Sequence, residues 1–388
     1  MAEFNYNIFR RALYKIIRAI EFYLSHLVRK KKNLIVYYPV HFNSLTGDCI
    51  FLFDYILKND SNIEQFILVN NKIEINYPQY QGYIVNRYSL RGIMLVLKAK
   101  FLVIDADGPF RKGKFSIIQL WHGAGFKNIL ALSGKYNLSF NKKRFTNICL
   151  VCATSKNDKI RKIKSFLTKE VFITGSPSND FFFQEQTKHK IQDLKQNLKI
   201  DDSQRIFLYA PTYRKNSIIN NLSDLFFEQL QNLAKDNNFM FLIKRHPKDK
   251  SYYSVDSFSN ITDITDNATQ LQELLLGTDL LITDYSSIAT DFALLKRPII
   301  FYTYDIDDYM ETQRGFYYDL KRILPGPFAN TEEELLCLIK ELSWFEDSNY
   351  QNKFKGFQDM FHLYMDGDSS QRVHKYILKL MKVGGALR

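Results

Sequence analysis

Residues 280–302, LLITDYSSIATDFALLKRPIIFY, constrain the fold of this chain more than any other stretch. The stretch begins and ends with apolar runs typical of buried strands, and the segment between them has a hydroxyl-rich turn followed by helical character. Thr283, Ser286 and Ser287 lie where the first strand ends and the helix begins. Backbone N–H groups and the positive end of a helix meet at such a point, so the stretch predicts a phosphate-binding turn.

Two histidines follow other apolar runs in the same way. His122 stands in WHGAG and His246 stands in RHPK, each directly after a run typical of a buried strand. A single histidine at a strand end is more often structural, and Ser286 or Ser287 alone would most simply cap a helix. Open α/β sheets bind ligands at the carboxyl ends of their strands, so the repetition favours one site built from these segments.

The rest of the chain alternates short apolar runs with helical segments. The expected strands are 34–38, 65–69, 83–85, 101–104, 117–120, 148–153 and 171–174 in a first series, and 205–209, 239–243, 280–283 and 299–302 in a second. Helices are expected at 89–98, 222–236 and 268–276, and the polar stretch 184–204 is expected to link the two series. Alternation of this kind predicts an α/β fold with two parallel-sheet domains.

Residues 1–32 predict a basic amphipathic helix. Its apolar stripe consists of Phe9, Leu13, Ile16, Ile17, Ile20, Leu24 and Leu27, and Arg10, Arg11, Lys15 and Arg18 lie on the opposite side. Such a helix can lie in the headgroup plane of an anionic membrane, where each basic residue adds ~1 kcal/mol. A helix packed on its own domain has the same periodicity, but the basic run 29–32 favours membrane contact. No apolar stretch reaches the ~20 residues of a membrane-spanning helix, and no signal peptide is expected.

The chain carries a formal charge of +12 over 388 residues. This charge suits nucleotide diphosphates, anionic polymers or an anionic membrane surface. Nucleic acid is not expected as a partner, because no helix-turn-helix, zinc-finger or RNP-like pattern is present and the lysines are not gathered with aromatic residues.

Neither the cysteines nor the acidic residues predict a metal site. Cys149 and Cys152 lie within one apolar run, which favours core thiols over a zinc or redox motif and fits the cytoplasm. Asp105 and Asp107 resemble the metal-binding DxD pair of other glycosyltransferases, but they lie away from the serine-rich turn. No metal and no cofactor are assigned.

Six segments together resemble the CDP-glycerol glycerophosphotransferase family of teichoic-acid and capsule synthesis. They are WHGAGFKNI (121–129), GSPSND (175–180), APTYR (210–214), RHP (245–247), TDYSSIATDFALLKRPIIFYTYD (283–305) and MDGDSSQRV (365–373). Their order and spacing make the signal more specific than any single motif. The resemblance implies a GT-B-like fold, in which two Rossmann-type halves face a cleft. It also implies transfer of a polyol phosphate from CDP-glycerol or CDP-ribitol to a hydroxyl of a lipid-linked or polymeric glycan, with release of CMP, at the inner face of the cell membrane.

The resemblance also implies roles for the two halves. Residues 33–185 would form the acceptor domain and 186–388 the CDP-donor domain, with the final helix free to cross back to the first domain. His122 would take the proton of the acceptor, with His246 as the alternative base. The donor phosphates would be bound by Thr283, Ser286, Ser287, Arg245, Thr212 and Arg214, and Gly123, Gly125, Asp284 and Asp291 are further candidates.

Several alternatives stay open at this point. Gly123 and Gly125 suit a packing turn as well as close approach of a ligand, Arg214 suits a surface ion pair, and Asp291 suits either ribose or helix packing. Ser178 stands where many members carry arginine, so the acceptor is left undefined. The same motifs would suit a GT-B glycosyltransferase that uses a nucleotide sugar, or a non-catalytic adaptor at the membrane surface. Glycerol and ribitol are not distinguished.

Overall fold

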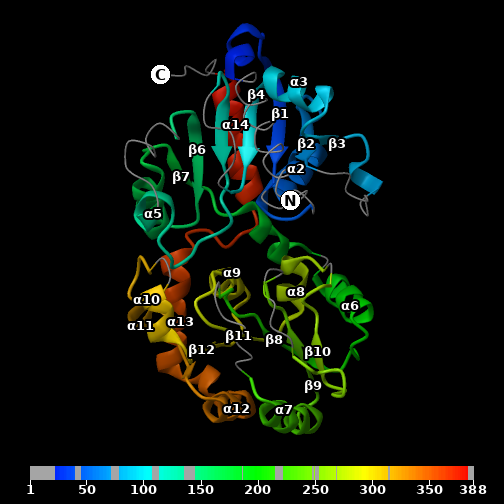
Figure 1. Cartoon of the computed structure of the whole chain (residues 1–388), viewed down its shortest axis with the longest axis vertical. Coiled ribbons are helices and arrows are strands. Elements are labelled where there is room, and N and C mark those ends of the chain that lie inside the picture. The colour runs from blue at the N-terminus through cyan, green and yellow to red at the C-terminus, as the bar shows by residue number, and fades with distance from the viewer. Residues whose placement is uncertain are drawn as a thin grey trace, which may run out of the picture.

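The computed structural model describes residues 22–39, 45–70, 78–106, 113–134, 145–185, 187–214, 222–246, 249, 253–267, 269–312 and 315–382. Within these ranges the chain forms two parallel β-sheets, one above the other along the long axis of the molecule (Figure 1). The expected α/β fold with two parallel sheets is confirmed. Residues 1–21 of the predicted amino-terminal helix lie outside the described residues.

The first sheet has seven strands in the order β3-β2-β1-β4-β5-β6-β7, and all pairs are parallel. Its strands are β1 (Lys31–Tyr38), β2 (Glu64–Val69), β3 (Ile84–Asn86), β4 (Ala99–Ile104), β5 (Ser116–Gln119), β6 (Ile148–Ala153) and β7 (Val171–Ile173). The second sheet has six strands in the order β10-β9-β8-β11-β12-β13. They are β8 (Arg205–Tyr209), β9 (Phe239–Ile243), β10 (Ile261–Asp263), β11 (Leu280–Thr283), β12 (Ile299–Tyr302) and β13 (Phe328–Ala329). We call the parts built on these sheets the first half and the second half.

Helices cover the sheets and join the two halves. The α-helices are α2 (Asp48–Asn59), α3 (Leu90–Lys98), α5 (Lys156–Phe166), α6 (Thr187–Asn197), α7 (Asp224–Asp236), α8 (Leu271–Gly277), α9 (Ile288–Phe292), α10 (Ile306–Thr312), α11 (Leu320–Ile323), α12 (Glu332–Lys340), α13 (Ser348–Phe361) and α14 (Ser369–Lys382). The 3₁₀ turns are η1 (Pro78–Tyr80), η2 (Leu130–Ser133), η3 (Pro177–Phe183), η4 (Ala293–Leu295) and η5 (Leu342–Glu346). None of the helices in the described ranges is long and apolar enough to cross a membrane.

Each sheet is buried on both faces. Leu34 of β1 packs in one apolar cluster, and its neighbour Ile35 packs in a second cluster on the opposite face. Ile206 and Phe207 of β8 divide between two clusters in the same way. Successive side chains of a strand point to opposite faces, so a strand covered by helices on both sides must be apolar throughout. This is why continuous apolar runs, and not alternating ones, mark the strands of this chain.

Two sequence interpretations are corrected by the structure. Strand β1 begins at Lys31, and the described end of the amino-terminal helix spans residues 22–27, so Lys31 and Lys32 belong to the sheet. The polar stretch 184–204 is not a plain linker, because it contains α6. Leu194 of α6 is buried and lies against Gly277 at the end of α8. That tertiary contact stabilises a helix whose own sequence is largely polar.

The last helix, α14, runs back along the first sheet (Figure 1). Val373 and Ile377 are fully buried in the same apolar cluster as Ile35 of β1. The N-terminus of α14 is fastened by Asp180 of η3, whose two carboxylate oxygens accept the backbone N–H groups of Ser369 and Ser370 at 2.8 and 2.7 Å. The GSPSND and MDGDSSQRV segments therefore bind each other.

Candidate active site

The turn that carries His122 follows β5 in the first half. Trp121 adopts φ 63°, in the left-handed region that non-glycine residues rarely enter. Its backbone N–H donates to Gln119 Oε1 at 2.8 Å, and its ring stacks on the His122 imidazole with centroids 4.4 Å apart. Such a backbone conformation persists only where surrounding contacts enforce it, and here they place an exposed histidine at a strand end.

A hydrogen bond to the backbone defines the tautomer of His122. Its Nδ1 lies 2.9 Å from the backbone carbonyl oxygen of Asp105. A carbonyl can only accept, so Nδ1 carries the hydrogen in this pair, and in the neutral ring Nε2 is the nitrogen without a hydrogen. The Asp105 carboxylate accepts the backbone N–H of Cys49 at 3.3 Å, which fixes the carbonyl from the other side. An exposed imidazole held in this tautomer is suited to accept a proton.

The glycine-rich turn continues directly into the second half. Phe126 is buried in the second half's core, with its ring 5.5 Å from that of Phe361. A Cβ added to Gly125 would lie 3.3 Å from Cβ of Ser287, and one added to Gly123 would lie 3.4 Å from the Asp291 carboxylate. Both glycines therefore serve close packing of two chain segments, and they bring His122 to the serine-rich turn.

The serine-rich turn offers hydroxyl groups but only a short helix. Ser286 and Ser287 are half-buried, and α9 behind them has five residues before the chain tightens into η4. The predicted positive helix end is therefore weak, because only a few aligned peptide dipoles contribute to it. Ser286 Oγ accepts the Ile288 N–H at a long 3.5 Å, and Ser287 makes no side-chain cap. Capping of α9 therefore does not account for the two serine side chains at this turn.

Three other donor-side candidates are bound to one another. Asp284 accepts the backbone N–H of Thr212 at 2.9 Å and forms an ion pair with Arg214. The Arg214 guanidinium also donates to both oxygens of Asp305, at 2.8 and 2.9 Å. Arg214 is thus neither a surface ion pair nor a guanidinium facing an open site. It fastens the APTYR loop to the ends of β11 and β12.

Thr283 has a supporting role of the same kind. Its hydroxyl is fully buried and donates to the carbonyl of Ala210 at 2.7 Å. The sequence placed this hydroxyl among the phosphate ligands, but the structure uses it to join β11 to the end of β8. The hydroxyl hydrogen of Thr283 is therefore already used in a bond within the fold and is not available to a phosphate.

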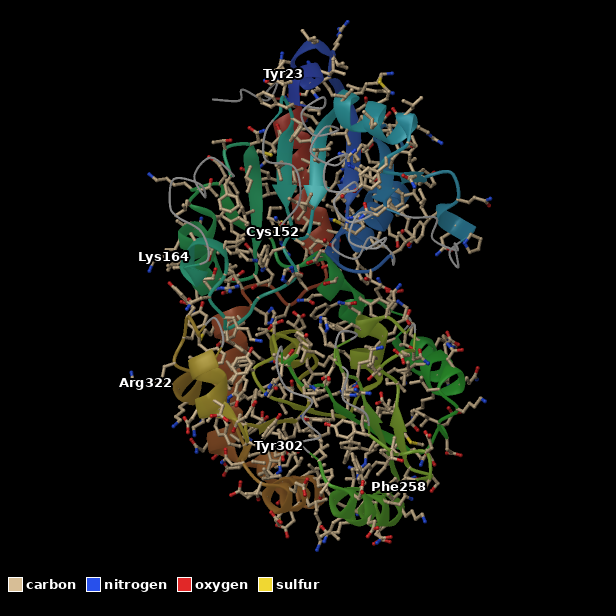
Figure 2. All side chains as sticks on the ribbon, viewed as in Figure 1. Tyr23, Cys152, Lys164, Phe258, Tyr302 and Arg322 are labelled. Atoms are coloured by element: carbon tan, nitrogen blue, oxygen red, sulfur yellow. The ribbon has the colours of Figure 1, made fainter. Side chains whose placement is uncertain are left out.

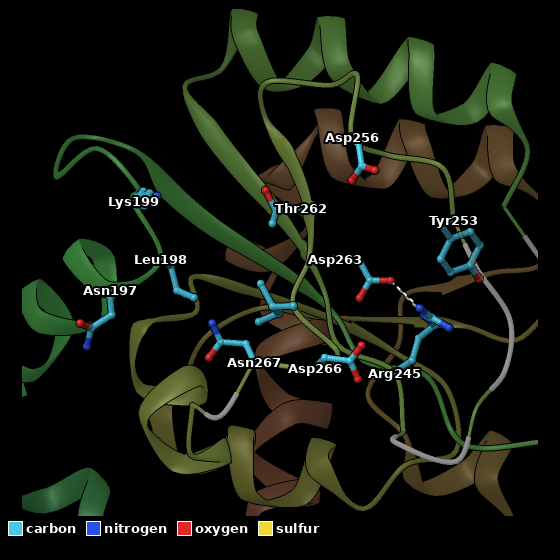
Figure 3. Close-up of a pocket in the computed structure, with 11 residues that line it drawn as sticks. Asn197, Leu198, Lys199, Arg245, Tyr253, Asp256, Thr262, Asp263, Asp266 and Asn267 are labelled. Atoms are coloured by element: carbon cyan, nitrogen blue, oxygen red, sulfur yellow. Dashed lines mark hydrogen bonds and ion pairs between the residues drawn. The ribbon is translucent and has the colours of Figure 1, made fainter. Parts of the chain in front are cut away.

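Arg245 and His246 follow β9. Arg245 is buried and its Nη2 lies 2.6 Å from Asp263 Oδ2, next to a pocket of about 400 Å³ at edge strand β10 (Figure 3). His246 is exposed, with its ring 5.2 Å from that of Tyr213 in the APTYR loop. The pocket is lined by Asn197, Leu198, Lys199, Arg245, Tyr253, Asp256, Thr262, Asp263, Ile264, Asp266 and Asn267, and so lies apart from His122.

Sequence reasoning assigned no role to Lys127 or to the carbonyl of Asp105. Lys127 lies in the half-exposed part of the junction, with Nζ 3.5 Å from Thr212 Oγ1 and 5.2 Å from the Tyr309 ring centre. Its backbone pairs with Phe316, and its carbonyl accepts from buried Arg161 at 3.1 Å. The position of Lys127, two residues after the glycine-rich turn, is the sequence feature that could have indicated a role for it. Asp107 lies outside the described residues, among which no group of acidic, histidine or cysteine side chains is arranged to hold a metal.

A model of the CDP-Glycerol:Poly(glycerophosphate) glycerophosphotransferase family matches residues 20–379. The chain belongs to this family. The match includes the turns that carry His122, His246 and the two serines, and it extends into α14.

Two relatives in this family come from Bacillus spizizenii. The chain is 28% identical to a teichoic acid poly(glycerol phosphate) polymerase, over 95% of this chain and 98% of the relative. It is 31% identical to a teichoic acid poly(ribitol-phosphate) polymerase, over 88% of this chain but only 56% of that longer relative. The structure of the wall teichoic acid polymerase TagF aligns with a TM-score of 0.81 over 97% of this chain and 96% of TagF, at 24% identity. This likeness confirms the GT-B-like fold expected for the family.

Proposed function

We propose that this protein transfers a polyol phosphate, most simply glycerol phosphate, from its CDP-activated form to a hydroxyl of a lipid-linked or polymeric glycan in teichoic acid or capsule synthesis. Family membership and the named relatives support this reaction class. The observation that carries it furthest is the contact between the His122 turn and Ser287. In the proposal, the His122 imidazole and the hydroxyls of the serine-rich turn act together at this junction.

The proposed reaction needs little covalent help from the protein. A lone pair of the acceptor hydroxyl forms the new P–O bond at the polyol-bearing phosphorus, and the bridging P–O bond to CMP breaks with its electrons leaving on CMP. His122 Nε2 takes the hydroxyl proton. Positioning and charge stabilisation supply most of the rate in phosphoryl transfer of this type.

Groups of the second half bind the donor in this proposal. Ser286 and Ser287 donate hydrogen bonds to phosphate oxygens, and His246 approaches the donor from the end of β9. Lys127 reaches the same junction from the first half, where its ammonium can offset negative charge on the leaving phosphate. Arg214, Asp284 and Thr283 hold the loops that present these groups and are not direct ligands.

A donor screen tests the proposal directly. Purified protein is incubated with CDP-glycerol, CDP-ribitol or a UDP-sugar and an acceptor with a free terminal hydroxyl, and products are identified by mass. We expect CMP and an acceptor heavier by one polyol phosphate. His122→Ala should cut single-turnover rates by ~10²- to 10⁴-fold with little change in donor affinity, because a general base acts only during attack.

Replacing His246 should differ from replacing His122 in its effect on donor binding. His246→Ala should weaken CDP-donor binding measured by calorimetry as well as the rate. His189→Ala, on the exposed face of α6, is the matched control and should match wild type in both measurements. Turnover of a UDP-sugar instead of both CDP-polyols would establish the nucleotide-sugar alternative. Absence of transfer from every donor would leave the adaptor interpretation.

We further propose that the protein works in the cytoplasm on the inner surface of the membrane, through its amino-terminal segment. The described end of that segment carries exposed apolar side chains: Tyr23 is 69% and Leu27 81% exposed. Figure 2 places Tyr23 at the tip of the first half, away from the second half. Arg29 and Lys32 are exposed and suit anionic headgroups.

Liposome co-sedimentation tests this membrane contact. Replacing Tyr23, Leu24 and Leu27 by serine should reduce binding to phosphatidylglycerol vesicles while leaving turnover of a soluble acceptor unchanged. Leu225→Ser in α7, another exposed apolar position, is the matched control. Equal vesicle binding by the triple variant and wild type would show that this segment packs on its own domain.

A further inference from the structure

Asp291 is a half-buried carboxyl on the contact between the two halves. It lies on α9, four residues beyond Ser287, and accepts a hydrogen bond from Asn179 Nδ2 at 3.1 Å. Asn179 belongs to η3 in the GSPSND segment and is 4% exposed. The bond therefore joins two segments that are 112 residues apart in sequence. The ribose contact expected for Asp291 stays a prediction.

One half of the Asn179 amide has no partner. Among the described residues, Asn179 Oδ1 is buried and accepts no hydrogen bond. A buried acceptor without a donor is costly, and such groups in native proteins call for an explanation. The amide nitrogen of Asn179 already donates to the Asp291 carboxyl, so a proton on that carboxyl would supply a donor for Asn179 Oδ1.

We propose that Asp291 carries a proton when the two halves are joined, and that this neutral acid and the Asn179 amide form a two-bond pair that positions the His122 turn. In the pair, Asn179 Nδ2–H donates to Asp291 Oδ1 and the carboxyl O–H donates to Asn179 Oδ1. A carboxylic acid and a primary amide are complementary in this way. In this proposal Asp291 is a positioning residue, because it acts through the His122 turn.

The surroundings of Asp291 favour the neutral form. Burial raises its pKa to about 7; the hydrogen bond from Asn179 lowers it, the like charge of Asp48 on α2 raises it, and Lys162 on α5 lowers it. Lys162 is occupied by an ion pair with Asp158 at 2.9 Å. His362, the C-cap residue of α13, binds the Thr290 carbonyl; burial lowers its pKa to about 4, so it is uncharged at neutral pH.

The pair acts on His122 through Gly123. A Cβ on Gly123 would lie 3.4 Å from both carboxylate oxygens of Asp291, so the backbone next to His122 rests on this carboxyl. Ionisation removes one hydrogen bond of the pair and leaves a half-buried charge beside the turn. In this proposal that charge favours separation of the two segments, which moves His122 away from Ser287.

Infrared spectroscopy tests the protonation without substrate. At neutral pH the wild-type protein should show the carbonyl-stretch band of an un-ionised carboxyl, and the band should be absent in Asp291→Asn and should disappear from wild type as the pH is raised well above 7. A wild-type spectrum identical to that of Asp291→Asn, or to that of Asp291→Ala where the first variant does not fold, overturns the proposal. This arm does not depend on the proposed function.

The pH profile of polyol-phosphate transfer tests the positioning and rests on the proposed function. Asn at 291 can form both hydrogen bonds at any pH, so Asp291→Asn should lose the fall in kcat at high pH and exceed wild type there. Asn179→Ala should lower kcat about tenfold at neutral pH by loss of the pair. Asp180→Asn, a matched change at a half-buried carboxyl next to Asn179, should keep the wild-type high-pH fall. Inactivity of folded Asp291→Asn at every pH would show that the ionised carboxylate is the working form and overturn the proposal.

Discussion

Gly125 and Ser287 lie in direct contact although they belong to different halves of the chain, and a Cβ on Gly125 would lie 3.3 Å from that of Ser287. This separation is tighter than most Cβ contacts, so the turn has no room for a side chain. The same turn is anchored by Phe126 in the second half's core. Close approach of the two turns at this point therefore requires a glycine.

Gly125→Val should lower transfer from CDP-glycerol by at least tenfold. The added branched side chain must displace the serine-rich turn, and small misplacements of reacting groups cost large factors in rate. Single-turnover kinetics on folded protein measure the effect. Gly356→Val in α13, where no atom lies within 4 Å of the added Cβ, is the matched control and should retain the wild-type rate. Equal rates for both variants would show that this contact does not set the geometry.

Ser286→Ala combined with Ser287→Ala should weaken binding of the CDP-donor. Loss of hydrogen bonds to a charged phosphate should cost roughly 1 to 3 kcal/mol of binding free energy, measured by calorimetry. A matched double change at exposed serines of the same half, Ser203→Ala with Ser259→Ala, should leave donor affinity unaltered. Wild-type affinity in the folded Ser286–Ser287 variant would exclude the serine pair as donor ligands.

Arg214→Ala should destabilise the fold more than it alters any single ligand contact. The change leaves the buried carboxylate of Asp284 and the half-buried one of Asp305 without their shared cation, which should lower the free energy of unfolding by about 3–5 kcal/mol. Denaturant unfolding measures this. Arg322→Ala removes an exposed ion pair to Asp319 and should cost under about 1 kcal/mol. Adding Asp305→Asn to Arg214→Ala should recover part of the loss.

The cap on α14 makes stability depend on pH through Asp180. Burial raises the pKa of Asp180 from 3.8 to about 6, against the hydrogen bonds from Ser370 and Ser369. The folded protein then binds this proton more tightly than the unfolded chain, so the contribution of Asp180 to stability is largest at low pH and falls as pH rises from about 4 to about 6. Denaturant unfolding at several pH values should show the free energy of wild type falling relative to Asp180→Asn across this window. A constant difference would contradict the raised pKa.

Most strands and their order along the chain could be predicted from local pattern. The runs at 148–153, 205–209, 239–243, 280–283 and 299–302 coincide with β6, β8, β9, β11 and β12. These strands are buried on both faces, so their apolar character is continuous and their ends are marked by polar turns. Strands β10 and β13 have three and two residues and give too short a signal. Helix α6 was missed because its stability comes from packing on α8.

The sequence by itself determined the two parallel-sheet halves, the turns at strand ends that carry His122 and His246, and the family. These features depend on residue spacing within one segment, which the chain order preserves. Only the tertiary structure decided which polar groups are already bound. Arg214 meets Asp305 across 91 residues and Asn179 meets Asp291 across 112, and no local pattern records such pairings. A side chain can bind a ligand only when its donors and acceptors are not already paired within the protein. Whether they are paired depends on residues far along the chain.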